Sequence, residues 1–387
     1  MKKTIDIIHI FCHKILGKKT KTKKLNQRSE FPMKKVISVV LVALMLAAVF
    51  AFAGCNKTGD EGTTNAPDAS ETATLKFGLG VVTEIDEPKN ADGDTNGSAN
   101  VNTTAVAVLL DAEGKIVDVK VDTLQAKTEW TAEGVAAAAT EAKTKYELGT
   151  DYNMAAFGKK HDGTEGKVLE WFEQIDAFAA TAKGKTVAEV KAFVGEDTYT
   201  TGDLAAAGCT ISVGSIMAAL DKAVAAAADT AATANDKLGM AFSTAVKNTD
   251  ATEEKAGAVE VNATVVATVV DAEGKVVVAK TDVAQTKVTF DTAGASTVDT
   301  TAELKTKGEL GTAYNMAAFG SKHDGSEGAV LEWNVQAAEF DKALVGKTAA
   351  DFAAFADETG YATGDLATAG CTSNVAELIK AATKAVA

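Results

Sequence analysis

Apolar residues at every second position predict a β-hairpin in the first half of the chain. The alternating positions lie on both sides of a turn at residues 111–114, where Gly114 is free to take a positive φ. The residues that share one face are Val106, Val108 and Leu110 before the turn, and Val117, Val119 and Val121 after it.

Apolar residues at helical spacing follow the hairpin. In two segments, which begin at Val168 and Val330, positions 0, 3, 7 and 10 are apolar, so we expect one buried helical face in each. The residues of these faces are Val168, Trp171, Ile175 and Phe178, and Val330, Trp333, Ala337 and Phe340.

Further helices are expected later in each segment. Thr186 and Thr348 each precede a carboxylate by three residues, which is the spacing of a helix N-cap. A last helix is predicted after Thr210 and after Thr372. Its apolar stripe in the earlier segment consists of Val213, Met217, Leu220 and Val224.

The chain repeats itself. Residues 145–171 return as residues 307–333 at an offset of 162, with 22 of 27 positions identical. The hairpin turn at residues 111–115 returns at residues 271–275, at an offset of 160. Because there are only two copies and the period is long, the pattern indicates a tandem duplication and not a solenoid.

Each copy starts with strand patterns and ends with helix patterns, which is typical of the α+β class. A weaker match at Gly78 and Gly239 lies near the start of each copy. We therefore predict two tandem homologous domains, each an antiparallel sheet followed by helices. The predicted divisions are an N-terminal extension with a lipoprotein signal peptide at 1–54, a flexible tether at 55–74, repeat 1 at 75–228, a linker at 229–236 and repeat 2 at 237–387.

The N-terminal part of the chain has the features of an export segment. Met33 and two lysines precede an uncharged apolar run at residues 36–52, which ends in Ala53-Gly54-Cys55. This ending resembles the lipobox of bacterial lipoproteins, in which the cysteine is lipidated and becomes the new N-terminus. We predict a start at Met33, lipidation at Cys55 and a protein anchored by lipid on the outer face of the cell membrane. The alternative to a start at Met33 is a long basic extension that stays cytoplasmic. The alternative to lipidation is a transmembrane helix, because the apolar run is nearly long enough to span a bilayer.

The distribution of charge also changes at the predicted end of the export segment. Residues 1–54 hold 11 basic and 2 acidic residues, which leaves 28 basic and 51 acidic residues from Cys55 onward, a net charge of −23. The only arginine is Arg28. A body this acidic, without a guanidinium group, excludes nucleic acid as a partner.

Several short motifs have a simple structural interpretation. The Gly-Lys-Thr triplets at 184–186 and 346–348 lack the earlier glycine of a phosphate-binding loop, so they are interpreted as helix starts. His161 and His323 lie in Lys-His-Asp-Gly, which favours a solvated loop over a metal site or a general base. Residues 92–97 match the first half of a calcium loop but lack its acidic last position, which favours a plain acidic turn. No Cys-x-x-Cys pair is present, and we assign no metal ligands.

The hairpin turn Asp111-Ala-Glu-Gly-Lys115 is followed, before each last helix, by the strings Ala207-Gly208-Cys209-Thr210 and Ala369-Gly370-Cys371-Thr372. Together these segments resemble the bacterial FMN-binding domain family. Members of that family often occur in tandem, are exported and carry electrons, and a threonine of their signature is esterified to the FMN phosphate by a flavin transferase. Alanine stands in both copies where the family has a serine, and cysteine where it has an alanine.

The resemblance implies that Thr210 and Thr372, with Gly208 and Gly370, bind FMN covalently or non-covalently. It implies an extracytoplasmic flavin-based electron carrier, closer to an electron-transfer or binding protein than to a catalyst, with a flavin transferase and redox proteins as partners. The candidates for the wall of a flavin site are Tyr152, Met154 and Phe157 in repeat 1 and Tyr314, Met316 and Phe319 in repeat 2, although such residues more often belong to a core. The alternative is a surface binding or structural lipoprotein without cofactor, which the alanines at 207 and 369 favour. A third hypothesis, a calcium-stabilised adhesin, depends only on residues 92–97.

Overall fold

The computed structural model describes residues 74–138, 142–157, 168–319 and 330–387, which belong to one compact unit. Each repeat contributes three long strands. In repeat 1 these are β1 (Lys76–Ile85), β2 (Gly97–Leu110) and β3 (Ile116–Trp130), and a short β4 (Ala228–Asp229) follows later; in repeat 2 they are β5 (Lys237–Thr249), β6 (Gly257–Val270) and β7 (Val276–Phe290).

The strands form two antiparallel sheets. The first has the order β3-β2-β1-β4 and the second the order β5-β6-β7. β2 pairs with β3 over residues 97–110 and with β1 over residues 101–110, and β6 pairs with β7 over residues 257–270 and with β5 over residues 258–270. The predicted hairpin is therefore confirmed in repeat 1 and recurs in repeat 2.

Short and long helices follow the strands in each repeat, as expected for an α+β chain. Repeat 1 has α1 (Lys145–Leu148), the 3-10 helix η1 (Gly149–Tyr152), α3 (Trp171–Ala182), α4 (Val187–Lys191), α5 (Gly202–Ala206) and α6 (Gly214–Ala225). Repeat 2 has α7 (Lys307–Leu310), η2 (Gly311–Tyr314), α9 (Trp333–Leu344), η3 (Ala349–Phe355), α10 (Gly364–Thr368) and α11 (Ala376–Ala385).

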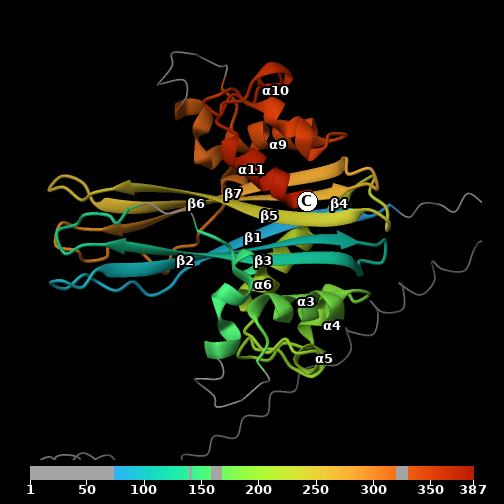
Figure 1. The fold of residues 1–387 in the computed structure, drawn as a ribbon, viewed down its shortest axis with the longest axis horizontal. Helices are drawn as coiled ribbons and strands as arrows, with labels where there is room; N and C mark the ends of the chain where they lie inside the picture. The colour runs from blue at the N-terminus through green and yellow to red at the C-terminus, as the bar shows by residue number, and fades with distance from the viewer. Residues whose placement is uncertain (1–73, 139–141, 158–167, 320–329) are drawn as a thin grey trace, which may run out of the picture. The chain divides into compact units, whose positions relative to one another are not determined.

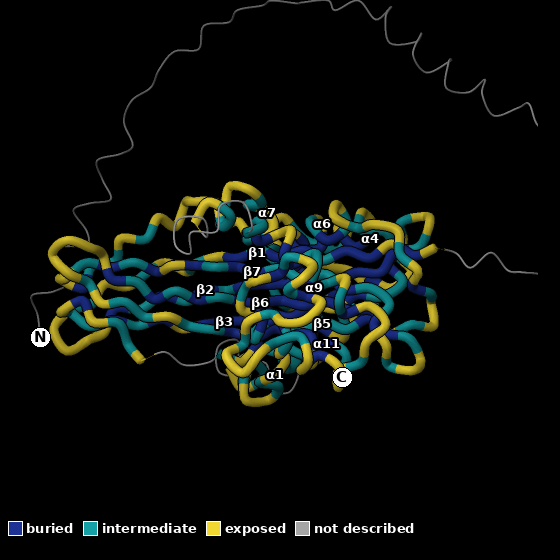
Figure 2. Tube along the Cα trace, turned by 90° about the horizontal axis from the view of Figure 1, so that it is seen from above, coloured by how far each residue is buried: buried dark blue, intermediate teal, exposed yellow. Residues whose placement is uncertain are grey.

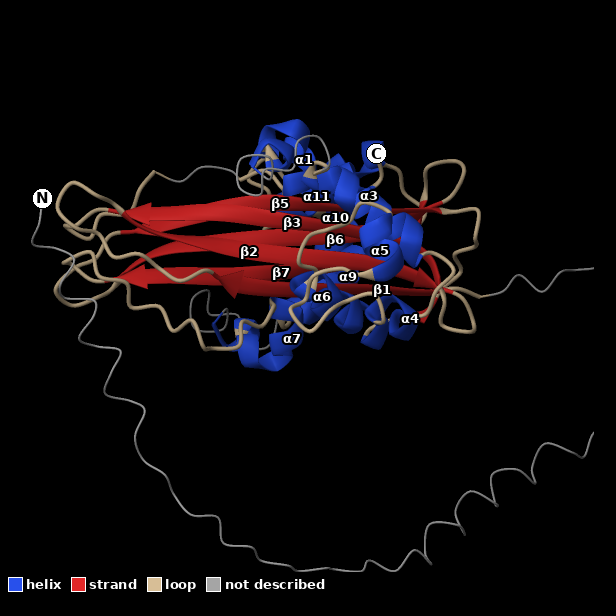
Figure 3. Ribbon diagram, turned by 90° about the horizontal axis from the view of Figure 1, so that it is seen from below, coloured by secondary structure: helices blue, strands red, loops and turns tan. Residues whose placement is uncertain are grey.

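The described residues build four layers, in the order helices, sheet, sheet, helices (Figure 1). The helices of each repeat cover the outer face of their own sheet, and the inner faces of the two sheets pack against each other. Viewed from above and below, the long strands run side by side through the centre of this unit (Figures 2 and 3). Both faces of each sheet are thus buried, which explains why β2 and β6 have continuous apolar ends.

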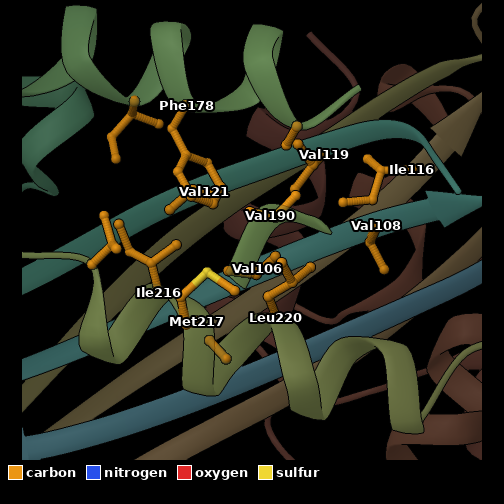
Figure 4. Close-up of a cluster of buried hydrophobic side chains, with 14 of the residues drawn as sticks. Val106, Val108, Ile116, Val119, Val121, Phe178, Val190, Ile216, Met217 and Leu220 are labelled. Atoms are coloured by element: carbon orange, nitrogen blue, oxygen red, sulfur yellow. The ribbon is translucent and has the colours of Figure 1, made fainter. Parts of the chain in front are cut away.

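The core of repeat 1 fills the space between β2, β3 and the helices (Figure 4). The predicted strand residues contribute to it with one exception. A bulge in the ladder pairs Leu110 with Ile116, so that Ile116 lies in this core and Val117 packs in the cluster on the opposite face. The prediction for Val117 was therefore wrong, because a bulge shifts the alternation by one residue.

The predicted helix faces are confirmed except for their first residues, Val168 and Val330, which lie before the helices and are half-buried. In α3 the residues Trp171, Ile175 and Phe178 are buried, and in α9 the equivalent Trp333, Ala337 and Phe340 are buried. A polar residue is buried on each face as well, Gln174 in α3 and Gln336 in α9. The apolar spacing gave no indication of these glutamines.

The threonine caps also form as predicted. Thr186 accepts a hydrogen bond from the Glu189 N–H at 3.3 Å, and the Glu189 carboxylate accepts one from the Thr186 N–H at 2.7 Å. Thr348 and Asp351 form the equivalent capping box at the start of η3. The Gly-Lys-Thr triplets therefore start helical turns.

Glycines allow the last helix of each repeat to lie directly on its sheet. A Cβ atom at Gly78 would lie 1.9 Å from the carbonyl oxygen of Ala223 in α6, and one at Gly239 would lie 1.8 Å from that of Ala385 in α11. The weak sequence match between these glycines thus marks a close approach of helix and strand, which only a residue without Cβ permits.

Contacts between the repeats come in pairs that the duplication relates. The Ala91 N–H donates to the Gly294 carbonyl at 2.9 Å, and the Ala251 N–H donates to the Gly134 carbonyl at 2.8 Å. Repeat 1 donates the hydrogen bond in the first contact, and repeat 2 donates the equivalent bond in the second. The repeats therefore face each other like the subunits of a two-fold dimer, whose interface uses the same patch twice.

Aromatic rings lie at the centre of one end of this interface. The rings of Trp130 and Phe290, which are equivalent residues, stack with centroids 5.1 Å apart and planes at 2°. The Trp130 indole N–H also donates to the Gly294 carbonyl at 2.8 Å. Gly97 and Gly257 lie against these rings, because a Cβ at either position would come within 2.4 Å of the Trp130 ring or 2.3 Å of the Phe290 ring.

The segment between the repeats, residues 229–236, packs against the first sheet. Asp229 pairs with Lys76 of β1. Ala232 is buried in a cluster that also contains Phe77 and Leu238.

Candidate functional site

The residues singled out by the resemblance lie in two equivalent loops, which we call the Gly-Cys-Thr loops: residues 208–210 and 370–372. Gly208 has a φ of 101° and Gly370 a φ of 99°, values that strongly favour glycine. A Cβ at these positions would also meet the side chains of Leu169 and Leu331 at 2.7 and 2.5 Å. Both glycines are therefore required by the shape of the loop.

Within each loop the cysteine points inward and the threonine is exposed. Cys209 and Cys371 are buried free thiols. Burial raises the pKa of Cys209 to about 11 and raises that of Cys371. Neither thiol is a nucleophile at neutral pH. From the sequence, a cysteine at the same position of each repeat is interpreted as a small buried side chain, and the structure confirms this interpretation.

A buried glutamine holds each loop in place. In repeat 1 the Gln174 side-chain oxygen accepts hydrogen bonds from the Thr210 N–H at 2.8 Å and from the Thr210 hydroxyl at 3.3 Å. In repeat 2 the Gln336 oxygen accepts from the N–H groups of Thr372 and Ser373 at 2.9 and 3.0 Å. Each glutamine amide donates in turn to the carbonyl of the leucine that contacts the loop glycine.

The same glutamines connect the loops to the predicted wall residues. The Gln174 amide lies 3.3 Å from the Met154 sulfur, and the Gln336 amide lies 3.6 Å from the Met316 sulfur. The structure thus brings Thr210 and Met154 to opposite sides of Gln174.

The aromatic wall candidates differ in exposure. Tyr152 packs against the core, and the Lys145 ammonium lies 5.0 Å from the centre of its ring. Phe157 and its equivalent Phe319 are 62% and 61% exposed.

The last helix of each repeat starts well after the threonine. Helix α6 begins at Gly214 and α11 at Ala376, each four residues beyond Thr210 or Thr372. The helix termini are therefore not adjacent to the threonine hydroxyls. The N–H of each threonine is already bonded to its glutamine, so neither is free to bind a phosphate.

The remaining candidates from the sequence either lie outside the described residues or form an ordinary turn. His161 and His323 lie outside the described residues, as does Cys55. Residues 92–95 form a tight turn closed by the Asp92 and Thr95 backbones, and residues 252–255 form the same turn in repeat 2. Among the residues that the structure describes, no group of three or more His, Cys, Asp or Glu side chains is arranged to hold a metal ion.

Two equivalent grooves run between the repeats, and sequence reasoning missed them. The larger, of about 570 Å³, contains Asp282 and Asp341. The smaller, of about 330 Å³, contains Asp122 and Tyr146. The larger groove has Gly308 where the smaller groove has Tyr146. The absence of a side chain at this position leaves more open space in the larger groove.

The grooves contain buried carboxyl groups. Loss of hydration raises the pKa of Asp122 and Asp341 to about 6 in each case, and it raises the pKa of Asp282 as well. Hydrogen bonds from neutral groups partly oppose the effect; the Thr281 hydroxyl, for example, donates to Asp341 at 2.5 Å.

No family model, curated protein or solved structure matches this chain. Within the described ranges no helix has the length and apolar character needed to cross a bilayer.

Proposed function

We propose that this chain is an exported, lipid-anchored protein whose two FMN-binding-like repeats each carry one flavin and pass electrons outside the cytoplasm. The observation that carries the proposal is the equivalence of the two Gly-Cys-Thr loops, each with an exposed threonine on a backbone fixed by a buried glutamine. The flavin would supply the redox chemistry, and the protein would hold and orient it.

The donor set fits a covalent link better than a non-covalent phosphate site. The N–H groups of Thr210, Thr372 and Ser373 are bonded to glutamine oxygens. The chain after Arg28 also has no arginine to grip a phosphate. Attachment through the threonine hydroxyl needs neither kind of group, only an accessible oxygen and a transferase that recognises the loop.

The test uses the full-length chain, expressed with its export segment in a bacterium that also produces a flavin transferase. Denatured protein is examined by in-gel flavin fluorescence and intact mass. We expect two FMN groups in the wild type, one in Thr210→Ala or Thr372→Ala, and none in the double variant.

Matched controls are Thr201→Ala and Thr363→Ala, which remove exposed threonines a few residues upstream of each loop and should leave both flavins in place. A wild-type protein that carries no added mass would refute covalent attachment.

Anchoring is tested separately. Cys55→Ser removes the predicted lipid attachment and should release the protein from the membrane fraction into a soluble extracytoplasmic fraction. Retention of the variant in the membrane would instead support a spanning segment at residues 36–52.

A cofactor-free binding lipoprotein is the second candidate. It is favoured by Ala207 and Ala369, which replace the serine of the flavin-attachment signature. This candidate predicts that the wild-type chain stays colourless with the transferase present, while Cys55→Ser still releases it from the membrane.

A further inference from the structure

A hollow of about 660 Å³ lies in the helical layer of repeat 2, between α9, η3 and α10. Its apolar lining comes from small side chains and from Phe355 and Leu366. This volume is within the range of small-molecule sites in proteins. The hollow shares no lining residue with the grooves between the repeats, and at Ala369 it reaches the residue before the second Gly-Cys-Thr loop.

Repeat 1 fills the equivalent place with one of its own rings. A Cβ at Gly202, at the start of α5, would lie 2.9 Å from the Phe193 ring. The Lys185 ammonium lies 5.8 Å from the centre of the same ring, which is cation–π distance. In repeat 1 an aromatic ring therefore lies between a glycine backbone and a lysine.

In repeat 2 the equivalent ring, that of Phe355, lies elsewhere, although the glycine and lysine around its place are retained. Gly364 and Lys347 are the equivalents of Gly202 and Lys185, but a Cβ at Gly364 would meet nothing within 4 Å. Phe355, the equivalent of Phe193, instead stacks on Phe352 with centroids 6.0 Å apart and contacts Phe340 edge-on at 6.2 Å.

One substitution accounts for the difference. Phe352 stands where repeat 1 has Val190, a core residue of α4 (Figure 4). The added ring is fully buried and offers Phe355 an aromatic partner inside the layer. The segment also winds as the 3-10 helix η3 where repeat 1 has the α-helix α4.

The geometry points to a binding site for a small aromatic compound, whose ring takes in repeat 2 the place that Phe193 fills in repeat 1. Its ring would lie against Gly364 and Leu366, with Phe355 as a wall and Lys347 at the rim. Of the other charged residues in the lining, Glu339 pairs with Lys342 at 2.6 Å, Asp351 caps η3, and Asp365 lies in the first turn of α10. Since the positive and negative charges of the lining nearly balance and most of its other residues are apolar, a neutral or weakly polar ring is the occupant that fits.

The test uses 4-fluorobenzyl alcohol as the probe and the purified full-length protein, with binding followed by fluorine NMR. We expect one site per chain in the wild type. Phe352→Val should let Phe355 return over Gly364 and abolish binding. Phe193→Ala should open the equivalent place in repeat 1 and give a second site, which is a gain that general damage to the fold cannot produce.

Two controls address the chemistry of the site. Lys347→Met should weaken binding about threefold, because it removes the cation over the ring. Cyclohexylmethanol, of similar size but without a π system, should compete poorly. Near-UV circular dichroism checks that each variant is folded. The proposal is overturned if the wild type does not bind the probe, or if folded Phe352→Val binds as the wild type does and Phe193→Ala adds no site. Flavin content plays no part in this readout, so it is independent of the proposed electron-carrier function.

Discussion

The two repeats keep the same inner layers and differ in their outer ones. β2 and β6 have an identical pattern of buried and half-buried positions along 14 residues. By contrast, α4 is replaced by a 3-10 helix in repeat 2, and Ala179 of α3 is replaced by Asp341. An inner residue packs against the other repeat, so a change there disturbs two sheets at once. Most outer residues pack within their own repeat and are freer to diverge, and Asp341 is an outer residue at the edge of a groove between the repeats.

The largest expected effect comes from breaking the inner layers at Trp130. Trp130→Ala removes the stack on Phe290 and leaves the space under the ring empty, so the free energy of unfolding should fall by about 3–5 kcal/mol. Trp130→Phe keeps a ring but loses the hydrogen bond to Gly294 and part of the buried indole, at a cost of about 1–2 kcal/mol. Urea denaturation of both variants measures the difference. Equal losses would mean that the hydrogen bond, and not the stack, dominates.

Replacing the buried glutamine in either outer layer should lower the free energy of unfolding by less than Trp130→Ala does, and by similar amounts in the two repeats. Gln174→Leu and Gln336→Leu leave the loop N–H groups without an acceptor, and each should cost about 1–3 kcal/mol. The same variants should increase amide hydrogen exchange at Thr210 or Thr372, in the repeat that carries the change. If only one of the two variants lowered stability and increased exchange, the two loops would be held differently.

Asp341 gives a pH-dependent difference between the repeats. Its carboxyl has a pKa of about 6 in the folded protein, above the ordinary value near 3.8 of an unfolded chain. The folded state binds this proton more tightly, so the stabilisation is present below about pH 4 and is lost as the pH rises through 6. Asp341→Ala, which copies Ala179 of repeat 1, should therefore gain stability relative to the wild type between pH 4 and 7.5, by on the order of 1–2 kcal/mol.

Thermal unfolding at a series of pH values checks this expectation. Taking the difference between variant and wild type removes the contribution of titrating groups that do not interact with Asp341, which leaves Asp282 and Lys280 as the neighbours that contribute to the difference. Asp341→Asn, which keeps the shape of the side chain, should behave in the same way. A difference that does not change with pH would contradict the raised pKa.

The sequence predicts the local structure well because local structure depends on local patterns. The hairpin, the faces of α3 and α9 and the threonine caps all follow from spacing within about ten residues. Val117 was assigned to the wrong face because a bulge depends on the register of two strands, which spacing within one strand does not reveal. The α+β order of elements was also readable, since strand and helix patterns occupy separate parts of each repeat.

The features that depend on the meeting of distant segments could not be predicted. Gln174 looks like an ordinary polar residue in a helix, and only its contact with a loop 36 residues later explains its burial. The grooves exist because the sheets pack face to face. A comparison of the two copies could have signalled the hollow, since Phe352 in place of Val190 is visible in the sequence, but its consequence for Phe355 is not.

The smallest expected effect concerns the two ion pairs between the repeats. Lys222 pairs with Glu309 at 2.5 Å, and the equivalent Lys384 pairs with Glu147 at 2.6 Å. All four side chains are about a third exposed or more, so water and salt weaken each pair to less than about 1 kcal/mol.

Lys222→Met and Lys384→Met should each lower the free energy of unfolding by similar small amounts, with the losses adding in the double variant because the pairs lie in separate grooves. Urea denaturation at low and high salt measures them, and the losses should shrink as salt rises. A double variant that loses much more than the sum would mean that the charges, together with the apolar inner faces, hold the repeats in their two-fold arrangement.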